Sequence, residues 1–571
     1  MKQLVLLAIA PLLAAQTADW VFTNGRILTV DDKFRVVTSM AVQGERIVAT
    51  GTAASLRKFV GPKTRQIDLG GKTVIPGLID SHTHALDASL HEFDHEIPAM
   101  ATVGDVLEHI RKRARLLPEG EWIVLRQVFI TRLREQRYPT RAELDEAAPR
   151  HPVLFSTGPD AALNSLALAR NGITRETKSP AGNPGKVELD PKTGEPTGML
   201  RTSAAFVKTV PSGRQPTAAD KRARLKMLMA DYNSLGITSI ADRAATPAHI
   251  EIYRQMRAAG ELTARVFLNY HVTNPNGPWA EVEAEIGRAA EDPLHRYDNM
   301  LWLRGLKVFL DGGMLTGSAF MREPWGTSSI YSISDPNYRG MRYIDSERLF
   351  LLARASLRRE LQFTAHSVGD GAVQALIDAY ERVNREFAVR QGRPCLTHAN
   401  FMTAEGMETM ARIGIVADMQ PAWLEQDGAT LAKHFGLPRL RFFQPYATLF
   451  RQKIVVGGGS DHMQKIGGMR SVNPYHPFWG MWVAITRRPR WTSETLFAEE
   501  KLTREQALRL YTINNAFLTF EEKQKGSLEA GKLADFVILD RDYLKCPEEE
   551  IARIEPLETW LGGKRIYERA R

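Results

Sequence analysis

The pattern of hydrophobic and polar positions is strand-like at both ends of the chain. Apolar and polar residues alternate in DWVFTNGRILTV and SMAVQGERIVAT near the N-terminus, and in GKLADFVILD and TWLGGKRIYE near the C-terminus. Alternation interrupted by Asn-Gly, Gly-Glu and Gly-Gly pairs predicts short strands joined by tight turns. The two ends therefore predict one discontinuous β-sandwich domain, formed by residues 19–77 and 515–571.

Residues 78–514 show a different rhythm, in which apolar runs of strand length alternate with helical segments. Such alternation predicts a parallel sheet covered by helices, in the α/β class. The eight candidate strands are 74–84, 236–242, 263–272, 303–313, 361–369, 393–400, 414–421 and 453–461. Eight strand–helix units predict a (β/α)8 TIM-type barrel, which carries its functional groups at the C-terminal ends of its strands.

A long interval interrupts this rhythm after the first strand. About 150 residues separate the first strand from the second, which is too many for a loop in a compact domain. The interval has apolar runs of its own and a segment rich in Gly and Pro, SPAGNPGKVELDPKTGEPTG. We therefore predict an inserted subdomain over about residues 90–225, between strands 1 and 2 at the barrel mouth.

The first residues have a layout typical of a secretory signal peptide. One Lys is followed by an apolar run from Leu4 to about Leu13 and then by small residues. Because the run is too short to span a bilayer comfortably, we predict a cleaved signal over residues 1–18 and no stable membrane insertion. This predicts a periplasmic or secreted protein, and a cytoplasmic location is the alternative.

Composition excludes some classes of protein. With 571 residues, 43% of them hydrophobic, the chain can bury a large core and has the size of an enzyme. Its formal charge of +9 does not predict a nucleic-acid partner, because 75 Lys and Arg are scattered among 66 Asp and Glu. Two cysteines, Cys395 and Cys546, exclude a cysteine zinc cluster and allow at most one disulfide. Whether the chain forms a homo-oligomer stays open.

The stretch DSHTHALDASLHEFDHE holds two histidine patterns that could each bind a metal. His82 and His84, two residues apart on a strand, point to the same side at the C-terminal end of that strand. His91 and His95 match the HExxH pattern of zinc proteases, which requires a helix, but Pro98 ends any helix there within a turn. We therefore predict that the first pair binds metal and that the second lines the pocket or is structural.

Four further polar groups stand at or near the ends of candidate strands, namely Lys307, His366, His398 and Asp461. A lysine buried in a barrel must pair, lose its charge or be modified, since an unpaired buried ammonium is costly. His366 and His398 are 32 residues apart, about one strand–helix unit, and Asp461 follows His398 by 63 residues, about two units. Together with the first histidine pair, the polar groups therefore fall on strands 1, 4, 5, 6 and 8.

This set of residues, in this order, resembles the amidohydrolase superfamily of metal-dependent hydrolases. More narrowly, VIPGLIDSHTH, LGITSIAD, LKVFLDGG, HSVGDGAV, THAN, GGGSD and GKLADFVILD resemble the amidohydrolase family 3 branch, which includes N-substituted formamide deformylases. The likeness runs from about Trp20 to the C-terminus. It fails at one place. Members of the branch often carry Asp-Gly-His before Asn-Ser, whereas this chain has Gly158, Pro159 and Asp160 before Asn164, so any substrate contact of that histidine cannot be carried over.

The resemblance implies a zinc-type site at the barrel mouth with one or two divalent ions. The implied metal ligands are His82, His84, Lys307, His366, His398 and Asp461. Asp461 would also act as the general base, and His366 as a catalytic electrophile. Lys307 matches a position that is carboxylated in many relatives, which would turn a costly buried cation into an oxygen ligand. An unmodified Lys307 paired with Asp311 is the alternative.

The resemblance further implies an enzyme that hydrolyses a non-peptide C–N bond, in an amide or N-substituted formamide, by metal-activated water. Esters, lactones or cyclic imides are the alternative substrates, and a metal-binding protein without catalysis is the third interpretation. In each enzymatic case the partner is a small molecule. Side chains that follow the strand ends and are candidates to bind it are Met314, Gln420, Trp423 and His462.

Overall fold

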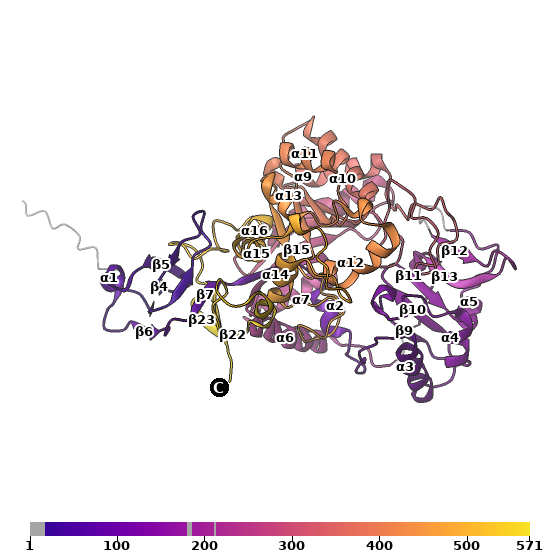
Figure 1. The fold of residues 1–571 in the computed structure, drawn as a ribbon, viewed down its shortest axis with the longest axis horizontal. Helices are drawn as coiled ribbons and strands as arrows, with labels where there is room; N and C mark the ends of the chain where they lie inside the picture. Colours follow the sequence, from indigo (N-terminus) through magenta and orange to yellow (C-terminus); the bar gives the residue numbers. More distant parts are fainter. Residues whose placement is uncertain (1–16, 180–184, 211–212, 571) are drawn as a thin grey trace, which may run out of the picture.

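A computed structural model describes residues 17–179, 185–210 and 213–570 of the chain. The predicted signal peptide lies outside the described residues except for Thr17 and Ala18. Within the described ranges, no helix combines the length and the apolar character that crossing a membrane requires. Figure 1 shows a central barrel, with sheets from the two chain ends on one side and the segment inserted after the first barrel strand on the other.

Eight parallel strands form the central sheet, and their spatial order follows their order in the chain. They are β8 (Leu78–Thr83), β14 (Ile237–Ala245), β15 (Arg265–His271), β16 (Leu301–Phe309), β17 (Gln362–Ser367), β18 (Cys395–His398), β19 (Val416–Met419) and β20 (Val456–Gly458). The loop after β20 nearly closes the barrel. The amide of Asp461 donates to the carbonyl of His82 at 2.8 Å, and the amide of His84 donates to the carbonyl of His462 at 2.8 Å. The predicted barrel is confirmed.

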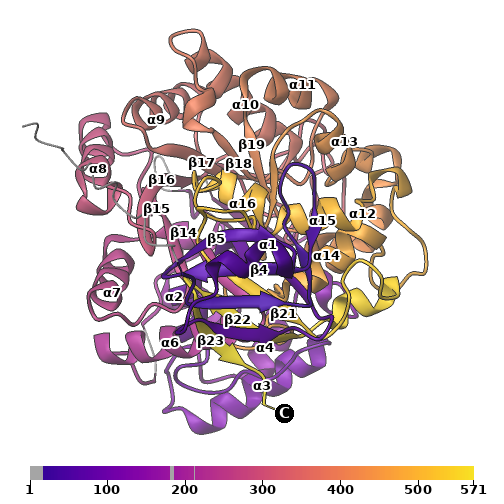
Figure 2. The ribbon, with the colours of Figure 1, turned by 90° about the vertical axis from the view of Figure 1, so that its left-hand side faces the viewer.

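Helices surround these strands in a ring (Figure 2). They include α6 (Ala218–Ser234), α7 (Pro247–Ala258), α8 (Trp279–Glu291), α9 (Ser346–Arg358), α10 (Asp370–Asn384), α11 (Ala404–Ile413), α12 (Ala422–Phe435) and α13 (Tyr446–Arg451). Their ends follow from local sequence. Thr217 and Asp220 form a capping box that starts α6, and Gly414, at φ +83°, ends α11. Apolar side chains of these helices except α12 share one buried core with the barrel strands, whereas those of α12 pack with residues of the inserted segment.

Strands from the two chain ends combine in one sheet of six strands, ordered β23-β22-β21-β7-β2-β3. These strands are β2 (Arg26–Leu28), β3 (Val36–Val37), β7 (Thr73–Pro76), β21 (Phe536–Leu539), β22 (Pro556–Leu561) and β23 (Lys564–Glu568). A four-stranded sheet of β1 (Trp20–Thr23), β4 (Ser39–Gln43), β5 (Arg46–Gly51) and β6 (Arg65–Asp68) packs beside it, with Phe22, Phe536 and Trp560 between them. The predicted sandwich is consistent with this pair of sheets, and its bounds stay a prediction.

Gly77 carries the chain directly from β7 into the first barrel strand. A Cβ atom at this position would lie 2.3 Å from the hydroxyl oxygen of Thr238, which only glycine avoids. Because β8 starts beside the sheets of the chain ends, its C-terminal end points to the opposite side of the barrel, where the inserted segment lies (Figure 1).

The inserted segment contains a five-stranded sheet of its own, ordered β12-β13-β11-β10-β9. It consists of β9 (Ile123–Leu125), β10 (Val153–Thr157), β11 (Asp160–Leu163), β12 (Lys186–Leu189) and β13 (Pro196–Arg201), with α3 (Val103–Leu116), α4 (Arg141–Ala147) and α5 (Ser165–Arg170) beside it. Asn164, from the motif that lacks the histidine, caps α5 and accepts the amide of Val153 at 2.9 Å. The two cysteines of the chain are buried and free.

Candidate metal centre

The C-terminal end of β8 presents His82 and His84 to the barrel mouth. His82 is completely buried, whereas the His84 side chain is 17% exposed and starts α2 (Ala85–Leu90). The two Nε2 atoms lie 3.3 Å apart. The strand geometry therefore brings both imidazoles to one point, at the distance of two donors that share an ion.

Asp461 reaches the same point from the loop that closes the barrel. Its Oδ1 atom lies 3.3 Å from Nε2 of His82 and 3.1 Å from Nε2 of His84. The residue has a φ of +55°, a conformation that few residues with side chains adopt. Before it, Gly459 passes so close to β8 that a Cβ atom would lie 2.8 Å from the amide nitrogen of His82. The glycines in GGGSD thus allow Asp461 to approach the histidine pair.

His398 and His366 complete a cluster of four imidazoles. The ring centroid of His398 lies 4.9 Å from that of His82 and 4.5 Å from that of His366. His82, His398 and Asp461 each offer a ligand atom, and these three atoms lie within 4.8 Å of one another. Burial lowers the pKa of His82, His398 and the partly exposed His366, to about 3 for His366, so these three rings are neutral and can donate lone pairs to a metal. Burial also acts to lower the pKa of His84, but its hydrogen bond and charge interaction with Asp461 act against burial, and the net effect raises that pKa.

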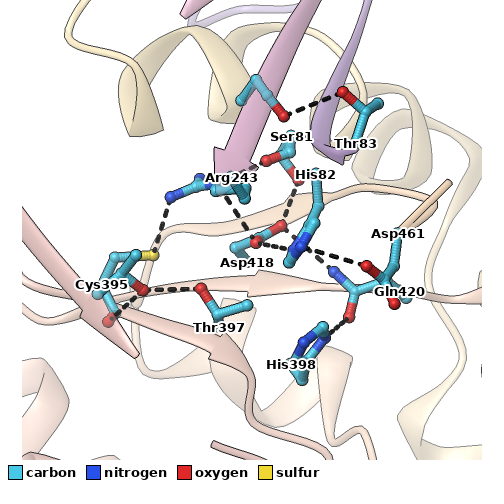
Figure 3. A network of polar contacts seen from close by, with 12 residues as sticks. Ser81, His82, Thr83, Arg243, Cys395, Thr397, His398, Asp418, Gln420 and Asp461 are labelled. Atoms are coloured by element: carbon cyan, nitrogen blue, oxygen red, sulfur yellow. Dashed lines mark hydrogen bonds and ion pairs between the residues drawn. The ribbon is translucent and has the colours of Figure 1, made fainter. Parts of the chain in front are cut away.

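Polar partners behind the cluster fix the orientation of two rings (Figure 3). Nδ1 of His82 lies 2.8 Å from Oδ2 of Asp418, and Ser81 donates to Oδ1 of the same carboxylate at 2.6 Å. Nδ1 of His398 lies 2.7 Å from Oε1 of Gln420. Because these oxygens accept, Nδ1 carries the proton in each ring and Nε2 keeps its lone pair free. The sequence prediction missed Asp418, although a lone acidic residue in the apolar strand GIVADMQP was an available signal.

Lys307 is buried on β16, and its Nζ atom has no hydrogen-bond partner among the described residues. Burial lowers the pKa of this amine to about 8. The alternative that Lys307 pairs with Asp311 was wrong. The Asp311 carboxylate instead accepts backbone amides, those of Phe320 at 2.9 Å and of Val368 and Gly369 at 3.0 Å. Asp311 therefore stabilises the loop after β16 through these hydrogen bonds, and the amine of Lys307 has no hydrogen-bond partner among the described residues.

The four residues predicted to bind substrate are all buried. Gln420 holds His398, and Trp423 stacks on His398 with ring centroids 4.9 Å apart. Nδ1 of His462 lies 2.7 Å from the hydroxyl of Tyr232, and its Nε2 faces two backbone carbonyls. Met314 packs in an apolar cluster that includes residues of the inserted segment. Their contact with substrate stays a prediction, and the structure gives each of them a packing or orienting contact.

Phe309 was not predicted and is partly exposed beside the cluster. Its ring lies 5.5 Å from that of His366 and 5.2 Å from Nζ of Lys307. Two residues after Lys307 on β16, it shares the face of the strand that carries the lysine. The two-residue repeat of side-chain direction along a β-strand was therefore the signal in the sequence that could have indicated Phe309.

The second histidine pattern lies outside this cluster. Helix α2 ends at Leu90, so His91 and His95 do not share a helix. Nε2 of His91 lies 3.4 Å from the carbonyl of Arg126, and Nδ1 of His95 lies 3.0 Å from the carboxylate of Asp94. In the described part of the chain, neither residue belongs to a group of three or more metal-binding side chains. Among the described residues, His91 and His95 therefore do not form the helical metal site of a zinc protease.

Comparison with known proteins agrees with this fold. The sequence profile of the amidohydrolase family matches residues 65–567. The chain is 30% identical to an N-substituted formamide deformylase of Arthrobacter pascens, over 97% of this chain and 99% of that protein. It is 27% identical to Protein LONG AFTER FAR-RED 3 of Arabidopsis thaliana, over 97% of this chain and 92% of that protein.

Solved structures with the same fold include two hydrolases. An uncharacterized metal-dependent hydrolase from Pyrococcus furiosus is 22% identical, has a TM-score of 0.64, and covers 92% of this chain and 100% of its own. Atrazine chlorohydrolase TrzN from Arthrobacter aurescens TC1, complexed with zinc, is 16% identical, has a TM-score of 0.53, and covers 96% of this chain and 95% of its own. At these identities the likeness shows the fold alone.

Proposed function

The chain belongs to the amidohydrolase family, and from this premise we propose that it cleaves a carbon–nitrogen bond in a small amide or N-substituted formamide. The family consists of hydrolases that depend on metal and act on small molecules. The observation that carries the proposal is the convergence of His82, His398 and Asp461, whose ligand atoms lie within 4.8 Å. The bond type is supported by the likeness to a formamide deformylase along nearly the whole chain.

The side chains at the barrel mouth fit a divalent metal, and we propose zinc. Neutral imidazole nitrogens and a carboxylate oxygen are the donors that catalytic zinc sites use. His82, His84, His366, His398 and Asp461 would hold one or two ions. The orienting contacts of His82 and His398 with Asp418 and Gln420 are of the kind that metal-ligating histidines make.

A divalent ion held here would supply Lewis acidity toward a carbonyl oxygen and would acidify a water molecule. Asp461 would accept the proton of the attacking water and return it to the leaving nitrogen. Burial raises the pKa of Asp461 above its ordinary value, toward the range of a general base. His366, with 16% of its side chain exposed, would act on the carbonyl oxygen as an electrophile.

We further propose that Lys307 is carboxylated. Its neutral amine would attack carbon dioxide, forming a nitrogen–carbon bond and releasing one proton to water, and the product would be an anionic oxygen ligand in place of a buried cation. The support is the unpaired amine and its pKa of about 8, which makes the neutral fraction near neutral pH much larger than that of an ordinary lysine. Isotope-labelled carbon dioxide should give a carbamate signal by NMR that is lost in Lys307→Met, and its absence in the metal-loaded wild type would exclude the modification.

The experiment that tests the function is hydrolysis of a substrate panel by the purified, metal-loaded chain. The panel contains N-substituted formamides, simple amides, esters, lactones and cyclic imides. We expect turnover of formamides or amides, and a fall in kcat of about 10²–10⁴-fold in Asp461→Asn. Asp94→Asn, which changes an exposed carboxylate outside the cluster, is the matched control.

Two results would change this assignment. Turnover of esters, lactones or cyclic imides without any turnover of formamides or amides would move the reaction to a different bond. Bound metal without turnover of any compound would favour a metal-binding protein that is not an enzyme.

Export to the periplasm or the medium is also proposed, on the basis of the N-terminal sequence alone. Fusing residues 1–25 to a reporter would test it, and retention of the reporter in the cytoplasm would contradict it.

A further inference from the structure

We propose that the inserted segment positions the carboxylate of Asp461 through Arg132 and Asn473, so that the barrel site is incomplete without the insertion. The inference rests on the proposed function of Asp461 as metal ligand and general base. Arg132 and Asn473 would act as positioning residues, because neither of them reaches the histidine cluster by a hydrogen bond.

Asn473 holds Asp461 through the carboxylate oxygen that does not face the histidines. Its Nδ2 atom donates to the backbone carbonyl of Asp461 at 2.8 Å and to Oδ2 of the same residue at 3.3 Å. The other carboxylate oxygen, Oδ1, faces His82 and His84. The two oxygens of Asp461 are therefore divided between the metal-binding histidines and Asn473, which sets the rotation of the carboxylate.

The amide of Asn473 can take only one orientation. Its Oδ1 atom accepts from Nη1 of Arg132 at 2.9 Å and from Nε1 of Trp423 at 3.2 Å. Arginine and tryptophan side chains are donors only, so the oxygen of Asn473 must face them and its NH2 group must face Asp461. Trp423 also stacks on His398, and it thereby links the position of Asn473 to that of a second proposed ligand.

Arg132 belongs to the inserted segment, in the short helix Ile130–Arg132. Its side chain is only 6% exposed and pairs at 3.1 Å with Asp427 of α12, which also accepts the hydroxyl of Thr131 at 2.7 Å. The guanidinium also donates to the carbonyl of Val472, the residue before Asn473. A buried cation with these bonds is held firmly, since each bond offsets part of its desolvation cost.

Asp461 needs such a support because of where it lies. Its positive φ and its place in the seam between β20 and β8 leave the residue without a strand or helix to fix its side chain. Misplacing a catalytic group by about 1 Å can cost about 10²-fold in rate. The Arg132–Asn473 contact thus ties the geometry of the proposed base to the docking of the insertion.

The test uses full-length Asn473→Ala, Arg132→Ala, Arg132→Lys and Trp423→Phe. Metal affinity by chelator competition, kcat and KM separately, and melting temperature are measured for each. We expect Asn473→Ala to lower metal affinity and kcat by about 10–100-fold, as loss of an outer-shell partner does, with a smaller change in KM. Arg132→Ala should act in the same direction, and Arg132→Lys should recover part of the loss.

Gln136→Ala is the matched control. It removes another contact between the insertion and α12, the 2.6 Å bond from Gln136 to Thr430, without touching Asn473. Its metal affinity and kcat should equal those of the wild type. An equal loss in this variant would mean that docking of the insertion matters in general and would overturn the specific role of Arg132.

A crystal structure of Asn473→Ala decides the matter independently of catalysis. We expect Oδ1 of Asp461 to move away from Nε2 of His84. An unmoved carboxylate together with unchanged metal affinity would overturn the inference, even if the wild type hydrolysed nothing and the proposed function failed. If Asn473→Ala does not fold, the same measurements on Arg132→Ala and Trp423→Phe decide it, because the second removes the donor to Asn473 and keeps a smaller aromatic ring at the position that stacks on His398.

Discussion

Two histidine pairs lie close together in the stretch from Asp80 to Glu96, and only one of them is in the candidate metal centre. His82 and His84 stand where β8 ends and meet Asp461, which lies 379 residues after His82. His91 and His95 follow the end of a short helix and contact groups on the surface of the insertion. The second pair matches the sequence pattern of a known metal motif. Position at the barrel mouth therefore indicates which pair is a candidate metal ligand better than local spacing does.

The partners of the two pairs differ in the same way. His82 is completely buried, and its partner Asp418 comes from β19, a strand that does not pair with β8. His95 pairs with Asp94, its neighbour in sequence, and both side chains are about 30% exposed. An exposed pair of this kind contributes about 0–1 kcal/mol, whereas a buried one constrains its ring firmly. Burial beside a distant carboxylate therefore distinguishes His82 from His95.

Removing the histidines themselves should give the largest difference between the two pairs. His82→Asn and His84→Asn should lose metal affinity and kcat by more than the roughly 10–100-fold typical of an outer-shell partner. His91→Asn and His95→Asn should keep both values. Metal analysis and kinetics of the four variants measure this, and loss of metal in either member of the second group would contradict the distinction.

Metal removal should show the same difference in stability. Metal at about 100 times its Kd stabilises a folded protein by about 2.7 kcal/mol, so a chelator should lower the melting temperature of the wild type. His91→Asn and His95→Asn should show the same fall, and His82→Asn should show none. Calorimetry with and without chelator measures it, and an unchanged wild-type melting temperature would argue against a bound metal.

Changing the partners of the rings should have a smaller effect. Asp418→Asn leaves His82 in place but removes its anionic acceptor, and we expect metal affinity to fall by about 10–100-fold. Asp94→Asn makes the equivalent change beside His95 and should leave metal affinity unchanged. Chelator competition measures both affinities, and equal values for the two variants would remove the orienting role of Asp418.

A last expected difference concerns His91 and pH. Burial lowers the pKa of His91 to about 4, below its unfolded value of 6.5, so the unfolded chain binds this proton more tightly. Stability contributed by the neutral ring should therefore decrease as pH falls from about 6.5 to about 4. His91→Gln should lose less stability than the wild type over this window, and parallel stability curves from chemical denaturation would contradict the expectation.

Local pattern alone was sufficient for much of the fold. The eight barrel strands were predicted because each is a continuous apolar run bounded by turn residues, and such runs are read without knowing their neighbours. The positions of His82, His84, His366, His398 and Asp461 followed from the rule that barrels place polar groups at strand ends. The sequence thus determined the architecture and the residues that meet at the mouth.

The contacts behind those residues were decided only by the tertiary structure. Arg132 is one of 75 Lys and Arg, and nothing near it in the chain marks it for Asn473, which lies 341 residues away. Pairing of an unmodified Lys307 with Asp311 was the alternative to carboxylation, but the loop after β16 turns the Asp311 carboxylate toward backbone amides. Partner choice depends on which surfaces fold together. A linear pattern records which side chains can bind, whereas packing alone determines which of them meet.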